Sequence, residues 1–239
     1  MMTGHIEIFS DPATLARHVA EWITSAALEA GDTFRVSLSG GSTPKTLYQL
    51  LASDEFLNQF PWQRVSWYFG DERFVHYDSP DSNYRMVREA MFAKAPVPSE
   101  NIHPIPVDGT PDAAAGRYER TLQQAYGATT LDPTRPLFDV TLLGLGPDGH
   151  TASLLPGEPV LEERKRWVAA VSHGRPEVRI TMTYPVIESS RRVAFLVAGR
   201  EKAPVFRDIR AGGSGVPAAR VRPVGELFWF VDRAAAGES

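Results

Sequence analysis

The sequence predicts a single α/β domain over residues 1–239, built on a doubly wound, mainly parallel sheet with helices on both faces. Short apolar runs alternate along the chain with segments of helical periodicity, and this alternation is typical of a parallel sheet covered on both sides. Residues 139–145 are nearly all apolar, as expected for a strand buried on both of its faces. A chain of 239 residues is long enough to form one core.

Local signals place the elements in order, beginning with a strand over residues 6–9. A helix is expected next, because Asp11 supplies a capping oxygen and Pro12 suits a first helical turn. Apolar side chains then recur at helical spacing until Gly31 ends the helix. The later strands are expected at 34–39, 65–70, 139–145, 167–171, 179–183, 193–197 and 228–231. The later helices are expected at 44–51, 82–92, 112–125 and 202–209, with a frayed tail after Asp232.

Composition excludes several classes of protein. The net charge is −4, whereas a nucleic-acid-binding protein typically carries a basic face. The chain has no cysteine, which excludes disulfides, thiol nucleophiles and thiolate metal sites. It has neither an apolar run of about 18 residues nor a signal-peptide pattern. We therefore expect a cytoplasmic protein, a monomer or small homo-oligomer, that binds a small molecule and neither nucleic acid nor membrane.

Glycine and polar residues directly follow four of the apolar runs. These stretches are 39–43, 70–73, 144–150 and 199–202. Ligands of an open parallel sheet bind beyond the carboxyl ends of its strands. If the strands are parallel, all four stretches meet at one edge of the sheet, and this edge is the expected site.

The first stretch predicts an anion site. Gly40 and Gly41 let backbone amides approach a ligand, Ser42 and Thr43 add hydroxyl donors, and the following helix begins with its positive end. The alternative is a simple Gly-Gly turn in which Ser42 or Thr43 only caps the helix. In the second stretch, Arg73 could bind a phosphate through two hydrogen bonds, or form a surface ion pair with its acidic neighbours.

Residues 144–149 match the pattern G-x-G-x-x-G, so a dinucleotide site must be considered. Two features argue against it. The segment after Gly149 is stopped by Pro156, too early for the usual crossover helix, and the next strand ends in Ser172-His173 rather than in an acidic residue.

His150 is the expected catalytic residue. It follows a buried strand in a turn set by proline, aspartate and glycine, and a free imidazole with a pKa near 6.5 is partly a base at neutral pH. Asp148 is close enough in sequence to orient the ring. The alternative is a loop histidine that caps the next helix, with Asp148 serving the turn. Helical zinc spacing and a G-x-S-x-G elbow are both absent from the sequence, so we expect no metal and no serine nucleophile.

At these residues the sequence resembles the 6-phosphogluconolactonases. The similar segments are SLSGGSTP at 37–44, WYFGDER at 67–73 with SNY at 82–84, LGLGPDGHTASLLP at 143–156, RIT at 179–181 and KA at 202–203. The resemblance implies the fold of the glucosamine-6-phosphate deaminases and ribose-5-phosphate isomerases. It also implies hydrolysis of 6-phospho-D-glucono-1,5-lactone to 6-phosphogluconate, in the oxidative pentose phosphate pathway, without a cofactor.

The resemblance further implies roles for individual residues. His150 would be the general base on water and Asp148 its partner. The implied substrate-binding residues are Gly40, Gly41, Ser42, Thr43, Asp71, Arg73, Asn83, Arg175, Arg179 and Lys202. Arg175 lies in a loop where the family often has a lysine, so it is expected to replace that lysine.

Two related activities and one non-enzymatic role must be separated from lactone hydrolysis. The deaminases read Ala-Phe-Asn-Glu-Pro after a similar Asp-Gly-His segment, whereas Leu155 stands here in place of their glutamate. Because a leucine side chain cannot accept or donate a proton, we reject deaminase activity. A phosphosugar isomerase on the same fold and a phosphosugar-binding regulator remain open.

Overall fold

The computed structural model describes residues 4–31, 33–172, 177–213 and 215–238. Its centre is a seven-stranded sheet in which every neighbouring pair of strands is parallel. The strands, in their order across the sheet, are β1 (His5–Phe9), β10 (Glu226–Asp232), β9 (Ser190–Val197), β6 (Phe138–Gly144), β2 (Phe34–Leu38), β3 (Val65–Phe69) and β5 (Ile102–His103). The expected parallel sheet is confirmed, although the short strand β5 was not foreseen.

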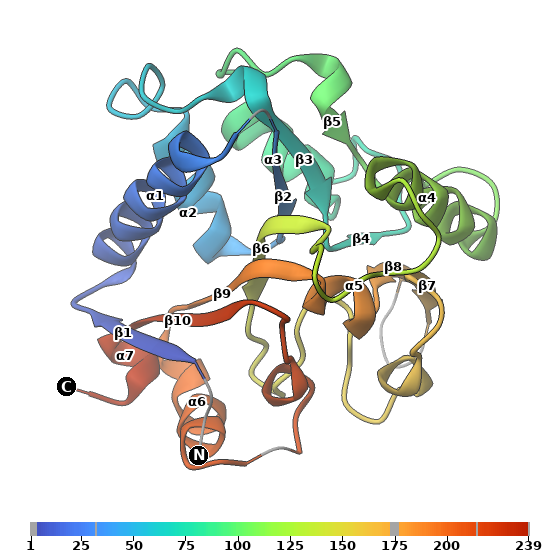
Figure 1. The fold of residues 1–239 in the computed structure, drawn as a ribbon. Helices are drawn as coiled ribbons and strands as arrows, with labels where there is room; N and C mark the ends of the chain where they lie inside the picture. The colour runs from blue at the N-terminus through green and yellow to red at the C-terminus, as the bar shows by residue number, and fades with distance from the viewer. Residues whose placement is uncertain (1–3, 32, 173–176, 214, 239) are drawn as a thin grey trace.

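The order of the strands creates a crevice next to β2 and β6. From β2 the chain adds β3 and then β5 on one side, whereas β6, β9 and β10 extend the sheet on the other side (Figure 1). Loops that leave neighbouring strands in opposite directions open a space at the carboxyl ends of these strands. The fold therefore places its ligand crevice where β2 and β6 end.

A second sheet was not predicted. Strand β4 (Asp71–Arg73) pairs antiparallel with β8 (Arg179–Met182), which pairs antiparallel with β7 (Val168–Val171). The strands expected at 167–171 and 179–183 are therefore present, but they lie in this second sheet and not in the parallel one. Helix α4 (Pro111–Tyr126) packs against β7 and β8, so these strands are buried too. A run of apolar residues predicts that a strand is buried, but it does not predict in which of two buried sheets the strand lies.

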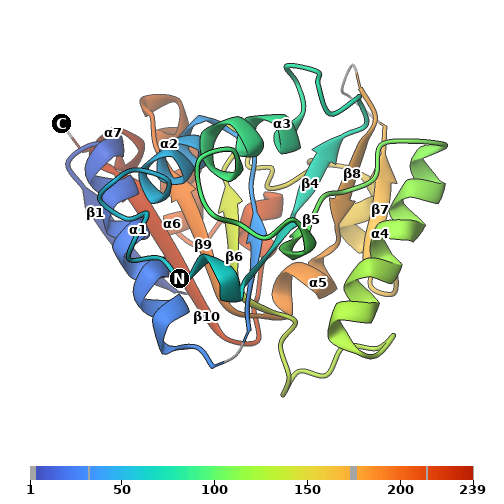
Figure 2. The same cartoon turned by 90° about the horizontal axis from the view of Figure 1, so that it is seen from above.

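Helices cover both faces of the large sheet. Figure 1 shows α1 (Pro12–Glu29) and α2 (Ser42–Leu51) on one face, with α5 (Tyr184–Glu188) and the small sheet on the other. In Figure 2 the small sheet and α4 lie at the opposite end of the molecule from β1 and α1. The helix expected at 202–209 is confirmed within one residue as α6 (Ala203–Arg210). The helix expected at 82–92 is instead α3 (Asn83–Val87) followed by a π-helical turn.

The expected frayed tail is instead a short helix, α7 (Arg233–Ala236). The Asp232 side chain accepts a hydrogen bond of 2.7 Å from the Ala235 amide and also faces the Gly199 amide. Composition suggested fraying, but this aspartate caps the helix and ties it to the end of β9. Within the part of the chain that the structure describes, no helix is long and apolar enough to cross a membrane.

Candidate active site

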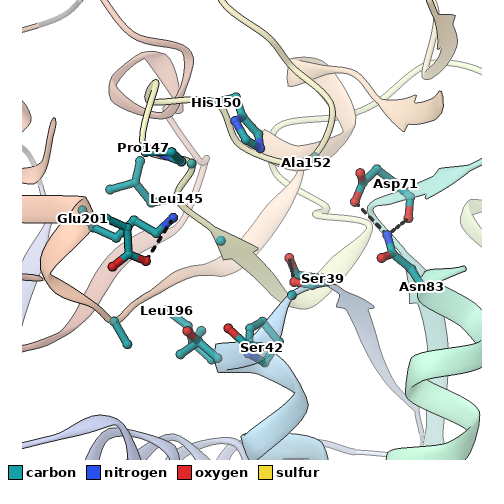
Figure 3. A pocket seen from close by; sticks show the side chains of 18 of the residues that line it. Ser39, Ser42, Asp71, Asn83, Leu145, Pro147, His150, Ala152, Leu196 and Glu201 are labelled. Carbon is teal, nitrogen blue, oxygen red and sulfur yellow. Dashed lines mark hydrogen bonds and ion pairs between the residues drawn. The ribbon is translucent and has the colours of Figure 1, made fainter. Parts of the chain in front are cut away.

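One pocket opens at the carboxyl ends of β2, β6 and β9 and is closed on one side by the small sheet. In Figure 3, His150 and Ser42 lie on opposite sides of it, with Asp71 and Asn83 at one end and Glu201 at the other. Each of the four glycine-rich or polar stretches contributes to its wall. The expected residues that line it are Gly40, Gly41, Ser42, Thr43, Asp71, Arg73, Asn83, His150, Arg179 and Lys202. Arg175 lies outside the described residues.

Helix α2 begins at Ser42, two residues earlier than expected, with Gly41 as its N-cap. Gly41 has φ 102° and no side chain caps the helix, so the alternative in which Ser42 or Thr43 only caps it does not hold. The first amides of a helix lack intrahelical partners, and the helix dipole adds positive potential there. Since Ser42 and Thr43 line the pocket, this end of α2 is suited to an anion.

A buried tyrosine fixes the chain just before this helix. The Tyr48 hydroxyl accepts a hydrogen bond of 2.9 Å from the Ser39 amide and donates one of 2.8 Å to the Ser39 carbonyl. Tyr118 holds Phe69 at the end of β3 in the same way, at 2.8 and 3.0 Å. Burial raises the pKa of both tyrosines well above the usual range. The sequence contained no pattern that singled out Tyr48.

Gly40 is required by the close approach of a neighbouring side chain. A Cβ atom at Gly40 would lie 2.1 Å from Asn83 Oδ1. Asn83 is 3% exposed and belongs to α3. The absence of a side chain at Gly40 therefore lets the α2 loop and the start of α3 meet inside the pocket.

His150 and Asp148 form a close pair. His150 Nδ1 lies 2.5 Å from Asp148 Oδ1, and the His150 carbonyl accepts a hydrogen bond of 2.8 Å from the Gly146 amide. Burial raises the pKa of Asp148, but the hydrogen bonds from the His150 side chain and backbone lower it more, so the pKa lies below its usual range. A carboxylate only accepts, so it selects the tautomer with the proton on Nδ1 and the lone pair on Nε2.

The G-x-G-x-x-G pattern builds this turn rather than a dinucleotide site. The chain between β6 and β7, which the structure describes in full, contains no α-helix. Gly149 has φ 81°, and a Cβ there would lie 2.4 Å from Val216 Cβ. Thr151 Oγ1 donates a hydrogen bond of 2.9 Å to the Gly144 carbonyl. The glycines are therefore explained by the shape of the turn that presents His150.

Three cations border the pocket. Arg73 on β4 lies directly opposite Arg179 on β8 in the register of the small sheet. Arg179 Nη2 is 3.0 Å from Glu177 Oε1, and Lys202 Nζ is 3.7 Å from Glu201 Oε1. Like charges opposite one another on a sheet are destabilising unless they are compensated. Glu177 balances part of the charge of the two facing arginines, and a dianion bound between their guanidinium groups would balance the rest.

Arg73 does not behave as a surface ion-pair residue. Its Nη1 donates to the Asp81 carbonyl at 2.6 Å and to Asn83 Oδ1 at 3.0 Å. The adjacent Glu72 is 1% exposed and accepts hydrogen bonds of 2.7 Å from the Asn83 and Tyr84 amides. Burial raises the pKa of Glu72 despite these bonds. Glu72 thus holds the start of α3 and leaves Arg73 to face the pocket.

Two further observations limit the chemistry. Within residues 4–31, 33–172, 177–213 and 215–238, no group of three or more His, Asp or Glu residues is arranged to hold a metal ion. Leu155, which stands where the deaminases have a glutamate, is buried in the protein and is not among the residues that line the pocket.

Comparisons with known proteins show what this chain is similar to. Residues 10–229 match the family described as glucosamine-6-phosphate isomerases/6-phosphogluconolactonase. A 6-phosphogluconolactonase of a Nostoc species is 37% identical, with 99% of each chain covered. The crystal structure of 6-phosphogluconolactonase from Thermotoga maritima has a TM-score of 0.81 and 31% identity, covering 95% of this chain and 99% of that one. A monomeric glucosamine-6-phosphate deaminase, at 21% identity, shares the fold with a TM-score of 0.80, covering 98% of this chain and 99% of that one.

Proposed function

We propose, from the premise that this chain belongs to the glucosamine-6-phosphate isomerase/6-phosphogluconolactonase family, that it hydrolyses 6-phospho-D-glucono-1,5-lactone to 6-phosphogluconate. The observation that carries the proposal is that one pocket is lined by both an uncapped helix start and His150. Asp148 does not line this pocket and contacts His150 Nδ1 from behind. We further propose that it serves the oxidative pentose phosphate pathway in the cytoplasm without a cofactor.

The phosphate group binds at the start of α2. Amides at a helix start bind phosphate without needing a side chain, and Arg73, Arg179 and Lys202 line the same pocket. A guanidinium can meet two phosphate oxygens at once. These contacts fix one end of the sugar, so that the lactone carbonyl lies near His150.

His150 then acts as a general base on water. Its Nε2 takes a proton as the water oxygen bonds to C1 of the lactone, and the carbonyl electrons move onto the carbonyl oxygen. When the bond between C1 and the ring oxygen breaks, the imidazolium returns the proton to that oxygen, which becomes a hydroxyl. The new carboxylic acid ionises and releases a proton to solvent. A positioned base of this kind contributes about 10²–10⁴-fold to the rate.

Asp148 supports the same proton transfer. Its carboxylate, with a pKa below the usual range, holds Nδ1–H and stabilises the imidazolium as it forms. The Gly146 amide is already bonded to the His150 carbonyl, so it serves the turn and not the developing oxyanion.

The test is a lactone-hydrolysis assay, with the spontaneous opening of the lactone subtracted. His150→Ala should lower kcat by about 10²–10⁴-fold while the binding of 6-phosphogluconate persists. His76→Ala is the matched control, because the His76 side chain is 81% exposed and lies outside the pocket. Equal turnover in the His150→Ala variant and the unchanged protein would refute the role of His150. Conversion of ribose 5-phosphate, or binding of 6-phosphogluconate without turnover, would instead favour the isomerase or the regulator.

A further inference from the structure

A chain of buried polar side chains connects the segment after His150 with Arg73. Ser153 Oγ donates a hydrogen bond of 2.7 Å to Asp71 Oδ2. Asn83 Nδ2 donates one of 2.9 Å to the Asp71 carbonyl and lies 3.4 Å from Asp71 Oδ1. Arg73 Nη1 completes the chain with a hydrogen bond of 3.0 Å to Asn83 Oδ1. Ser153, Asp71 and Asn83 are 0%, 6% and 3% exposed.

The chemistry of the neighbours fixes the orientation of the Asn83 amide. Its Nδ2 faces a carbonyl and a carboxylate of Asp71, which only accept hydrogen bonds, and its Oδ1 faces the Arg73 guanidinium, which only donates. Turning the amide over would oppose donor to donor and acceptor to acceptor. Asn83 therefore presents a fixed acceptor to Arg73 only as long as Asp71 stays in place.

Ser153 holds Asp71 in place from the catalytic side of the pocket. Ala152, between His150 and Ser153, has φ 47°, an uncommon conformation for a residue with a Cβ atom. The Ser153 amide is 3.3 Å from Thr181 Oγ1, and Thr181 is the register partner of Asp71. The turn that presents His150 is thus attached directly to the strand pair that carries Arg73.

We infer that Ser153, Asp71 and Asn83 are positioning residues that act on the substrate only through Arg73. This inference rests on the proposed function, because it takes Arg73 as a ligand of the phosphate. It changes the role that the family resemblance implied for Asp71 and Asn83, which lie in the pocket wall but use their polar atoms on protein groups.

A double-mutant cycle on the affinity for 6-phosphogluconate, measured by calorimetry, tests this inference. Asn83→Ala alone should weaken binding by roughly tenfold, as expected when a hydrogen bond to a charged group is lost. In the Arg73→Ala background, Asn83→Ala should change the affinity by less than about twofold, because the hydrogen bond between Asn83 and the guanidinium is already lost. If Asn83→Ala weakened binding by the same factor in both backgrounds, Asn83 would act on the ligand independently of Arg73, and the inference would be overturned. Unchanged binding in Asn83→Ala alone would overturn it as well.

Ser153→Ala provides a second cycle with Arg73→Ala, should Asn83→Ala fail to fold. Its matched control is Ser190→Ala, because Ser190 is 0% exposed, its Oγ donates a hydrogen bond of 2.8 Å to the Ile187 carbonyl, and it does not line the pocket. Ser153→Ala should raise KM for the lactone several-fold, and Ser190→Ala should lower the melting temperature without this rise. Equal KM changes in the two variants would reduce Ser153 to a structural role and overturn the inference.

The two proposals fail differently. An unchanged protein that neither opens the lactone nor binds 6-phosphogluconate contradicts both the proposed function and the inference. If the protein without substitutions opens the lactone and binds 6-phosphogluconate, but the two substitutions of each cycle act independently, only the inference is contradicted.

Discussion

Gly146→Ala should inactivate the protein without unfolding it. A Cβ atom at this position would lie 2.0 Å from His150 Nδ1 and 2.6 Å from Asp148 Oδ1. Non-bonded heavy atoms are normally about 3.5–4.0 Å apart, so the overlap with the imidazole exceeds 1 Å. Because the backbone fixes the Cβ atom, the imidazole must move away, and it then loses its hydrogen bond to Asp148.

The size of the effect follows from that displacement. With the base out of place, kcat should fall by about 10²–10⁴-fold, the same range as for removal of the imidazole. Stability should fall only by the loss of the His150–Asp148 hydrogen bond, about 1 kcal/mol, because Gly146 does not have a positive φ and alanine fits its backbone conformation. A change of about 1 kcal/mol would shift the melting temperature by only about 2–4 °C in a chain of this size.

The assay is steady-state lactone hydrolysis, corrected for spontaneous opening, together with a thermal melt. Gly116→Ala is the control, because a Cβ at Gly116 in α4 would have its nearest neighbour at 3.7 Å and this helix lies outside the pocket. Full kcat in Gly146→Ala would show that the His150–Asp148 geometry is not needed for turnover, and the mechanism would then be wrong.

Three further predictions concern pH, burial and backbone strain. The pKa of Asp148 is depressed in the folded protein, so its stabilisation is present above its unfolded pKa of about 3.9 and lost as pH falls through the folded value. The gap in melting temperature between Asp148→Asn and the unchanged protein should therefore close in acid, and a constant gap would contradict the stabilising pair with His150. Tyr48→Phe should reduce the free energy of unfolding by about 1–3 kcal/mol, because the buried backbone of Ser39 loses its hydrogen-bond partner. Denaturant titration measures this free energy, and an unchanged value would contradict a stabilising role for the Tyr48 hydroxyl. Ala152→Gly should leave the free energy of unfolding unchanged or raise it by up to about 1 kcal/mol, since glycine tolerates φ 47°; a clear loss in the same titration would contradict this.

Much of the fold was predictable because local signals and burial agreed. The Asp11 cap is observed, with hydrogen bonds of 3.0 and 2.9 Å from the Ala13 and Thr14 amides, and the nearly apolar run at 139–145 contains β6. In a parallel sheet the carboxyl ends of the strands share one edge, so the glycine-rich stretches could be placed together from the sequence. Ser42 and His150 were therefore expected at one edge of the sheet, and both line the same pocket.

What could not be predicted depends on pairing between distant segments. The small antiparallel sheet forms because β4 meets β8 more than 100 residues later, and no local pattern encodes that choice. Ser153 and Asp71 are in contact although they are 82 positions apart in the sequence. The hydrogen bonds between Tyr48 and the Ser39 backbone depend on the path of the loop before α2. The capping role of Glu72 was hidden because its hydrogen-bond donors lie on the far side of a loop.

A crystal structure with bound 6-phosphogluconate would decide whether the start of α2 and His150 bind the two ends of one ligand. We expect the phosphate at the amides of Ser42 and Thr43, within reach of Arg73, and the C1 carboxylate within hydrogen-bond distance of His150 Nε2. A ligand bound in the reverse orientation, with its phosphate at His150, or bound outside this pocket, would contradict this expectation.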